Sequence, residues 1–126
     1  MIRTLYYSPG KPIRTEIPPQ EFPQLIHGRK GLLWVDFTDE TPDVCEPILK
    51  GFGFHPLAIE DALQQTHSPK VDDWGDYIYV ALNYMHLLGE NNNGWDIEVD
   101  EVDIFFSKNY VITHHDYPVP ALDETW

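Results

Sequence analysis

The chain has a single cysteine, Cys45, and it lacks any long apolar run. One cysteine excludes a disulfide within the chain and is typical of a reducing compartment, so we expect Cys45 to be a small core residue. No stretch approaches the roughly 20 apolar residues that cross a bilayer, and the N-terminus lacks the charged and then apolar pattern of a signal peptide. We therefore expect residues 1–126 to be soluble as given.

Basic residues are also scarce. Eight Lys and Arg residues stand against 21 Asp and Glu residues, which gives a formal net charge of −13. Such a charge argues against nucleic acid or anionic lipid as the main partner, because both carry negative charge. Cations or a basic protein surface fit better, but a solvated, self-repelling surface explains the same charge.

The composition predicts one globular domain over residues 1–126, since 42% of its residues are hydrophobic and 13% are aromatic. We expect an α/β fold in which short helices pack on a mixed β-sheet. The strands predicted by apolar and β-branched patterning are residues 1–7, 12–17, 32–38, 77–87, 99–106 and 110–115, with a mobile turn at 89–94.

Alternation in the strand at 99–106 predicts one face with Val102, Ile104 and Phe106, and a solvated face with Glu101 and Asp103. Two interior strands with few helices to cover them also predict an apolar sheet face that is exposed or buried by self-association.

Four helical segments are predicted. The first is one or two turns around Phe22, and the last begins at residue 121. Between them, Thr41 and Pro42 fit the N-cap and first position of a helix that buries Val44, Cys45, Ile48, Leu49 and Phe52. Pro47 removes a backbone hydrogen bond inside this helix, so we expect a kink or a start nearer Pro47.

The third helix in chain order, predicted for residues 56–65, lies in the most informative stretch of the chain. Gly53 suits the end of the preceding helix, and Pro56 suits a first helical position, where its missing N–H costs nothing. On a helical wheel, Asp61 points away from the apolar side and Glu60 lies on the flank. The apolar side consists of Ile59, Ala62 and Leu63. We expect Asp61 to face solvent or a partner.

This stretch resembles the N-terminal cytoplasmic domain of CorA-type magnesium transporters. The matching pieces are His55-Pro-Leu, Glu60-Asp61-Ala-Leu, Pro69-Lys-Val, Tyr77, Trp34-Val-Asp-Phe-Thr, Ile104-Phe-Phe-Ser-Lys-Asn, Val111-Ile-Thr and Pro120-Ala-Leu-Asp-Glu. They cover residues 30–126 in the family's order and approximate spacing. One departure is Thr66-His67-Ser68, where the family commonly has His-Gln-Arg, and it puts the local packing and the ion selectivity in doubt.

The resemblance implies a cytoplasmic regulatory domain at the face of the cell membrane, cut before the stalk helix of a longer transporter for magnesium or cobalt. Full-length members are pentamers, and membrane contact would come only through segments beyond Trp126. The family's Glu-Asp pair contributes to a regulatory Mg²⁺ site between subunits, so Asp61 would be the main ligand and Glu60 an auxiliary one. The remaining ligands would lie on later helices, which implies weak, millimolar binding by this chain alone.

Other residues favour no catalytic chemistry. His114 and His115 are adjacent on a predicted strand and point to opposite faces, so they cannot both bind one metal without distortion. The chain has no zinc spacing, nucleophile elbow or phosphate loop, and we expect no enzyme activity. His67 fits a surface loop.

Two rival classes stay open. One is a related zinc transporter. The other is a small acidic interaction module or metal-dependent hydrolase, which requires a pocket where His114 or His115 meets Asp116 or another acid. The transporter reading instead requires Asp61 to stand on a helix away from such a pocket.

Overall fold

The computed structural model describes residues 1–28, 30–65 and 68–126. Within these residues, seven strands form one sheet in the order β2-β1-β3-β7-β6-β5-β4. The strands are β1 (Ile2–Tyr7), β2 (Arg14–Thr15), β3 (Leu32–Thr38), β4 (Lys70–Asp73), β5 (Ile78–Asn91), β6 (Gly94–Phe106) and β7 (Tyr110–His115). Neighbouring strands are antiparallel except β3 and β7, so the sheet is mixed, as predicted.

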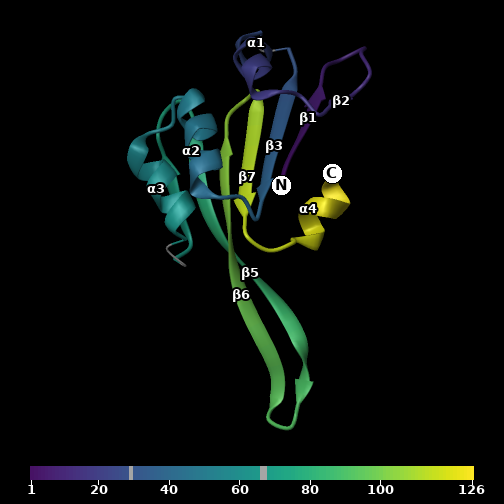
Figure 1. Ribbon diagram of the computed structural model, residues 1–126, viewed down its shortest axis with the longest axis vertical. Coiled ribbons are helices and arrows are strands. Elements are labelled where there is room, and N and C mark those ends of the chain that lie inside the picture. The colour runs from purple at the N-terminus through teal and green to yellow at the C-terminus, as the bar shows by residue number, and fades with distance from the viewer. Residues whose placement is uncertain (29, 66–67) are drawn as a thin grey trace.

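Helices lie on both faces of the sheet but cover them unequally (Figure 1). The helical elements are η1 (Pro19–Glu21), α1 (Phe22–His27), α2 (Pro42–Gly51), α3 (Pro56–Gln64) and α4 (Pro120–Thr125). The first four pack on the face that carries Leu33, Val35 and Phe37, and these side chains are fully buried. On the opposite face, α4 contacts β1 and β3 through Arg3–Asp123 and Trp34–Trp126.

The α2 helix begins at Pro42, as predicted, and continues through Pro47 to Gly51. The alternative start near Pro47 is therefore wrong. Cys45 is a free, buried cysteine, and burial raises the pKa of its thiol to about 11, as expected for a core residue. Val44, which we expected to be buried, is 41% exposed because it lies toward solvent in the first turn.

The predicted bounds of β3 and β7 are correct, whereas the predicted bounds of other strands differ from those in the structure. The segment predicted at 12–17 contains only the two-residue strand β2, and β4 was not predicted. The predicted turn at 89–94 is too long, because β5 runs to Asn91 and β6 begins at Gly94. Together β5 and β6 form a long hairpin that projects from the body of the domain (Figure 1).

The face of β6 predicted to be solvated is buried, and Val102 on the opposite face is buried as well. Glu101 and Asp103 are 1% and 0% exposed, and Phe106 on the opposite face is 37% exposed. The side chains of Asp103 and Phe105 point the same way, and Phe105 packs in the core beneath the helices. The Tyr79 hydroxyl donates a 2.5 Å hydrogen bond to Asp103, which offsets part of the cost of burying that carboxylate.

Over β4, β5 and β6, the sheet face opposite α2 and α3 carries partly exposed apolar side chains, as the predicted exposed face requires. Val71, Leu82 and Phe106 on this face are 69%, 47% and 37% exposed. Self-association through this face stays a prediction. Among the described residues, none of the helices is long and apolar enough to cross a membrane.

Candidate divalent-cation site

The α3 helix holds the two predicted metal ligands, Glu60 and Asp61. Its first turn is fixed by the His55 side chain, whose Nδ1 accepts a 3.1 Å hydrogen bond from the Leu57 amide, and by Pro56 at the first position. The helix ends at Gln64, and the C-cap residue Gln65 has a left-handed backbone with φ 51°. One side of α3 is anchored to the core by the buried residues Ala58, Ile59 and Ala62.

Glu60 is exposed, whereas Asp61 is half-buried, with 31% of its side chain accessible. This reverses the order expected from the helical wheel, which placed Asp61 outermost. The reason is β4, which runs beside α3 and brings Lys70 against Asp61. The Lys70 ammonium donates a hydrogen bond to Asp61 Oδ2 and lies 3.1 Å from Asp72 Oδ2.

The Lys70 ammonium occupies a position between carboxylates from two different elements. It also lies 5.5 Å from the centre of the Tyr79 ring. The hydrogen bond to Asp61 raises the pKa of Lys70, and the bond to Asp72 adds to this, against partial desolvation. The side chains of α3 and β4 therefore already hold one positive charge at this point.

The carboxylates around Lys70 match the coordination habits of Mg²⁺ in part. Magnesium keeps several of its waters and is commonly held by only one or two carboxylates. Asp61 and Asp72, which share the Lys70 ammonium, are two carboxylates of the kind that hold such a partly hydrated ion. The described part of the chain has no group of three or more His, Cys, Asp or Glu side chains placed to enclose a metal.

His114 and His115 point to opposite faces of β7, as predicted, and each meets a different carboxylate. His114 Nδ1 lies 3.7 Å from Asp103 Oδ2 on the face covered by helices. His115 Nε2 lies 3.0 Å from Asp36 Oδ1 on the other face. All four side chains are almost fully buried.

The hydrolase reading requires a pocket in which His114 or His115 meets Asp116 or another acid, but in the described part of the chain each histidine meets a buried acid instead. Asp116 lines a shallow hollow of about 470 Å³, together with Met1, Thr38, Asp39, Tyr117 and Pro118. Neither His114 nor His115 lines this hollow. Asp61 lies on another element, as the transporter reading requires.

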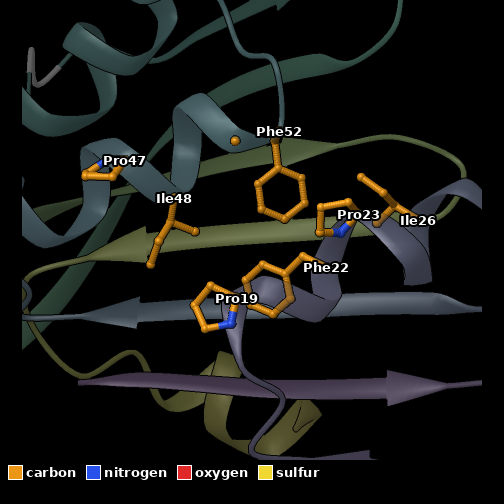
Figure 2. A pocket seen from close by; sticks show the side chains of 8 residues that line it. Pro19, Phe22, Pro23, Ile26, Pro47, Ile48 and Phe52 are labelled. Carbon is orange, nitrogen blue, oxygen red and sulfur yellow. The ribbon is translucent and has the colours of Figure 1, made fainter.

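A second hollow, of about 230 Å³, lies between α1 and α2 (Figure 2). Phe22, Pro23 and Ile26 face Ile48 and Phe52 across it. Because its lining carries no titratable side chain, this hollow offers apolar contact and no acid, base or metal ligand.

The Asp36–His115 pair was not predicted as an ionic pair. His115 Nδ1 lies 2.6 Å from the Tyr117 carbonyl oxygen, and Nε2 faces the Asp36 carboxylate. Both ring nitrogens thus face acceptors, which favours the doubly protonated imidazolium. Burial alone would lower the pKa of His115, but the bonds to Asp36 and to the Tyr117 carbonyl outweigh it and raise the pKa. Burial would raise the pKa of Asp36, but hydrogen bonds from His115, Thr113 and Arg3 lower it.

These shifts predict a pH dependence of stability. A raised His115 pKa gives stabilisation that is complete below the ordinary histidine pKa of about 6.5 and is lost as the pH rises through the raised value. A lowered Asp36 pKa gives stabilisation that is lost as the pH falls through that lowered value. We expect denaturant titrations from pH 6 to 9 to show a falling free energy of unfolding.

The His115→Gln variant provides the control for this pH dependence. It should flatten the fall in the free energy of unfolding between pH 6 and 9. A fall of unchanged size in this variant would assign the pH dependence to other groups.

Residues 29–126 match the family model for the CorA-like Mg²⁺ transporter protein. The chain belongs to the CorA-like Mg²⁺ transporter family. It is 34% identical over 89 residues to the putative metal ion transporter YfjQ of Bacillus subtilis, which covers 71% of this chain and 26% of that protein. It is 29% identical over 80 residues to the cobalt/magnesium transport protein CorA of Thermotoga maritima, covering 63% of this chain and 22% of the relative. The chain thus spans about a quarter of these curated relatives.

Solved structures share the fold of this CorA-family chain. The complete CorA magnesium transporter from Methanocaldococcus jannaschii matches 99% of this chain and 35% of its own, with a TM-score of 0.65 and 18% identity. The ZntB cytoplasmic domain from Vibrio parahaemolyticus matches 95% of this chain and 46% of its own, with a TM-score of 0.62 and 14% identity. At these identities the likeness shows the fold alone.

Sequence reasoning predicted Glu60 and Asp61 as ligands but missed Lys70, which pairs with Asp61, and Asp72, which shares that lysine. The signal was present in the Pro69-Lys-Val piece, which we used for the resemblance without assigning a role to the lysine. Thr66 and His67, which carry the departure from the family pattern, lie outside the described residues.

Proposed function

We propose that this domain senses divalent cations for a CorA-like transporter of magnesium or cobalt, on the cytoplasmic side of the membrane. Asp61 is the main ligand for regulatory Mg²⁺, with Glu60 as an auxiliary ligand. The observation that carries this proposal is the cation position between Asp61 and Asp72, where the Lys70 ammonium now lies. The remaining ligands would come from a neighbouring subunit of a homo-oligomer, a pentamer by resemblance.

Electrostatic repulsion between carboxylates would drive the response of such a sensor. Two like charges about 6 Å apart repel by about 3 kcal/mol at an effective dielectric constant near 20. Bound Mg²⁺ would supply the compensating charge between facing subunits. The proposal requires the ion to bind the closed and open assemblies with different affinities, because equal affinities shift no equilibrium.

Lys70 sets the affinity of the site within this chain. Its ammonium neutralises Asp61 directly, so an ion that binds Asp61 must first displace it. The lysine stem has four rotatable carbons and can swing aside, but the lost ion pair weakens binding of the metal. We therefore expect weak Mg²⁺ binding by the domain and tighter binding once other subunits add carboxylates.

A zinc transporter is the second candidate. The fold likeness to the ZntB cytoplasmic domain fits it, but the CorA magnesium transporter shares the same fold, so the fold does not separate the two. The oxygen-only ligands at Asp61 and Asp72 favour magnesium, since zinc prefers nitrogen and sulfur ligands. Parallel titrations with Zn²⁺ and Mg²⁺ separate the two, because a zinc sensor would bind Zn²⁺ tightly at a histidine.

The decisive experiment is a Mg²⁺ titration followed by NMR chemical shifts. We expect saturable millimolar shifts centred on Glu60 and Asp61, and their loss in Asp61→Ala. Lys70→Met removes the competing ammonium and keeps an apolar stem, so it should tighten Mg²⁺ binding by about three- to tenfold, or roughly 1 kcal/mol.

Asp43→Ala is the matched control, because Asp43 is an exposed acid in the first turn of α2. This variant should leave the Mg²⁺ affinity unchanged. Shifts spread evenly over the acidic surface, with the same affinity in Asp61→Ala, would contradict a specific site. Weaker binding in Lys70→Met would show that the lysine supports the site rather than competing for it.

A further inference from the structure

The arm formed by β5 residues 82–91 and β6 residues 94–101 has one apolar face. Across the two strands, Met85 is opposite Val99 and Leu87 is opposite Ile97, and these pairs lie on one side. Trp95 continues this side toward the tip. All five side chains are between 44% and 68% exposed, and the arm projects beyond the helices that cover the rest of this face (Figure 1).

The other face of the arm is acidic along β6, whereas along β5 it carries Leu82, Tyr84 and His86. Asp96, Glu98 and Asp100 alternate with the apolar residues of β6 and so point to the opposite side. His86 Nε2 lies 3.1 Å from Glu98 Oε2 and 3.2 Å from Asp100 Oδ2. No Lys or Arg occurs between Lys70 and Lys108, so every fixed charge on the arm is negative.

Both backbone edges of the arm are open within the described residues, because β4 pairs with β5 only from Ile78 to Ala81. The β6 edge is the one on which apolar and acidic side chains alternate. β7 pairs with β6 only from Val102 to Phe106, and within the described residues Gly94–Glu101 pairs with β5 alone. Proteins usually protect such an edge with lysine, proline or a covering loop, because unpaired N–H and C=O groups accept a further strand. The sequence of the arm has neither lysine nor proline.

We propose that the β6 edge of the arm binds an extended protein segment in which apolar and basic residues alternate. Such a segment would add a strand in line with β7. Its apolar side chains would extend the Ile97 and Val99 face, and its Lys or Arg side chains would lie beside Glu98 and Asp100 on the other face. Backbone hydrogen bonds supply affinity in this kind of recognition, and the alternating side chains supply specificity.

The negative charges of the arm favour this partner over a second copy of the chain and over an anionic membrane. A second copy that pairs edge to edge would place acids of one arm beside acids of the other, and like charges directly opposite are destabilising. An anionic membrane would meet the same carboxylates and be repelled. A basic alternating strand satisfies the apolar face, the acidic face and the open β6 edge together.

The test uses the whole 126-residue chain and a labelled ten-residue peptide of alternating Val and Lys. Fluorescence anisotropy should show saturable binding, and amide exchange of the unaltered protein should show new protection confined to residues 94–101. A peptide of the same composition, ordered with helical spacing, should bind at least tenfold more weakly. An alternating Val and Glu peptide should not bind.

Two double variants separate the contributions of the two faces. Ile97→Thr with Val99→Thr keeps β-branched residues but removes apolar surface, and it should weaken binding at least tenfold. Glu98→Gln with Asp100→Asn should weaken binding several-fold and reduce its salt dependence. Val71→Thr, at a valine on β4 that is 69% exposed, should change affinity less than twofold.

Several results would overturn the proposal. Protection at β4 instead of β6, or equal binding of the two lysine peptides, would reduce the effect to general attraction by an acidic protein. Concentration-dependent self-association that protects residues 94–101 without peptide would identify a second copy as the occupant. Arm-dependent binding to phosphatidylserine vesicles would identify a membrane instead.

Discussion

Replacing Asp36 with alanine should lower the free energy of unfolding by about 3–5 kcal/mol, because it leaves buried positive charge without its partner. Asp36 is fully buried and is the hub of a polar cluster on the α4 face. Its carboxylate lies 2.8 Å from Arg3 Nε and 3.0 Å from His115 Nε2, and it accepts a hydrogen bond from the Thr113 hydroxyl. Urea titration at pH 6.5 measures the change.

Matched variants distinguish charge from packing at Asp36. Asp36→Asn keeps the size and some hydrogen bonds, so it should cost less than Asp36→Ala. Glu124→Ala removes an exposed acid of α4 and should change stability by no more than about 0.5 kcal/mol. If Asp36→Ala cost less than 1 kcal/mol, the Asp36–His115 pair would contribute little net stability, as some buried ion pairs do.

The same cluster fixes α4 to the sheet. Arg3 bridges Asp36 and Asp123, and its guanidinium carbon lies 4.4 Å from the centre of the Trp126 ring. Trp126 in turn packs against Trp34 at 4.7 Å between ring centres. Loss of Asp36 should therefore loosen α4 before the helical side of the sheet, and amide exchange can follow this order.

The sequence predicted those features that depend on local pattern. The apolar run at 32–38 has side chains suited to burial on both faces, and β3 is an interior strand between β1 and β7. Gly53 and Pro56 mark the end of α2 and the start of α3, where the structure places them. Adjacent histidines on a strand must diverge, and His114 and His115 do.

Features that depend on which face is covered could not be predicted in this way. Alternation along β6 separates Glu101 and Asp103 from Val102 and Phe106, but it does not say which set lies under the helices. Tyr79 accommodates Asp103 from a strand 24 residues away in sequence. For the same reason, the helical wheel could not predict that Lys70 on β4 would pair with Asp61 and leave Glu60 as the more exposed carboxylate.

The candidate site depends on packing that holds α3 against the sheet. Phe54 lies in the short connection between α2 and α3 and is 4% exposed. Its ring centre lies 4.3 Å from that of Phe105 and 4.6 Å from that of Tyr77. These contacts fix the start of α3, and so the position of Asp61 relative to Lys70.

Phe54→Ala should lower the free energy of unfolding by about 3–5 kcal/mol, because it removes a buried ring and leaves a cavity. Phe54→Leu retains most of the apolar volume and should cost less, whereas Leu57→Ala, at a residue 58% exposed on α3, should cost under about 1 kcal/mol. Denaturant titration gives these values.

In protein that remains folded, the NMR signals of Asp61 and Lys70 should shift in Phe54→Ala, since α3 loses its anchor. A large loss of stability with those signals unchanged would show that β4 alone positions the ion pair.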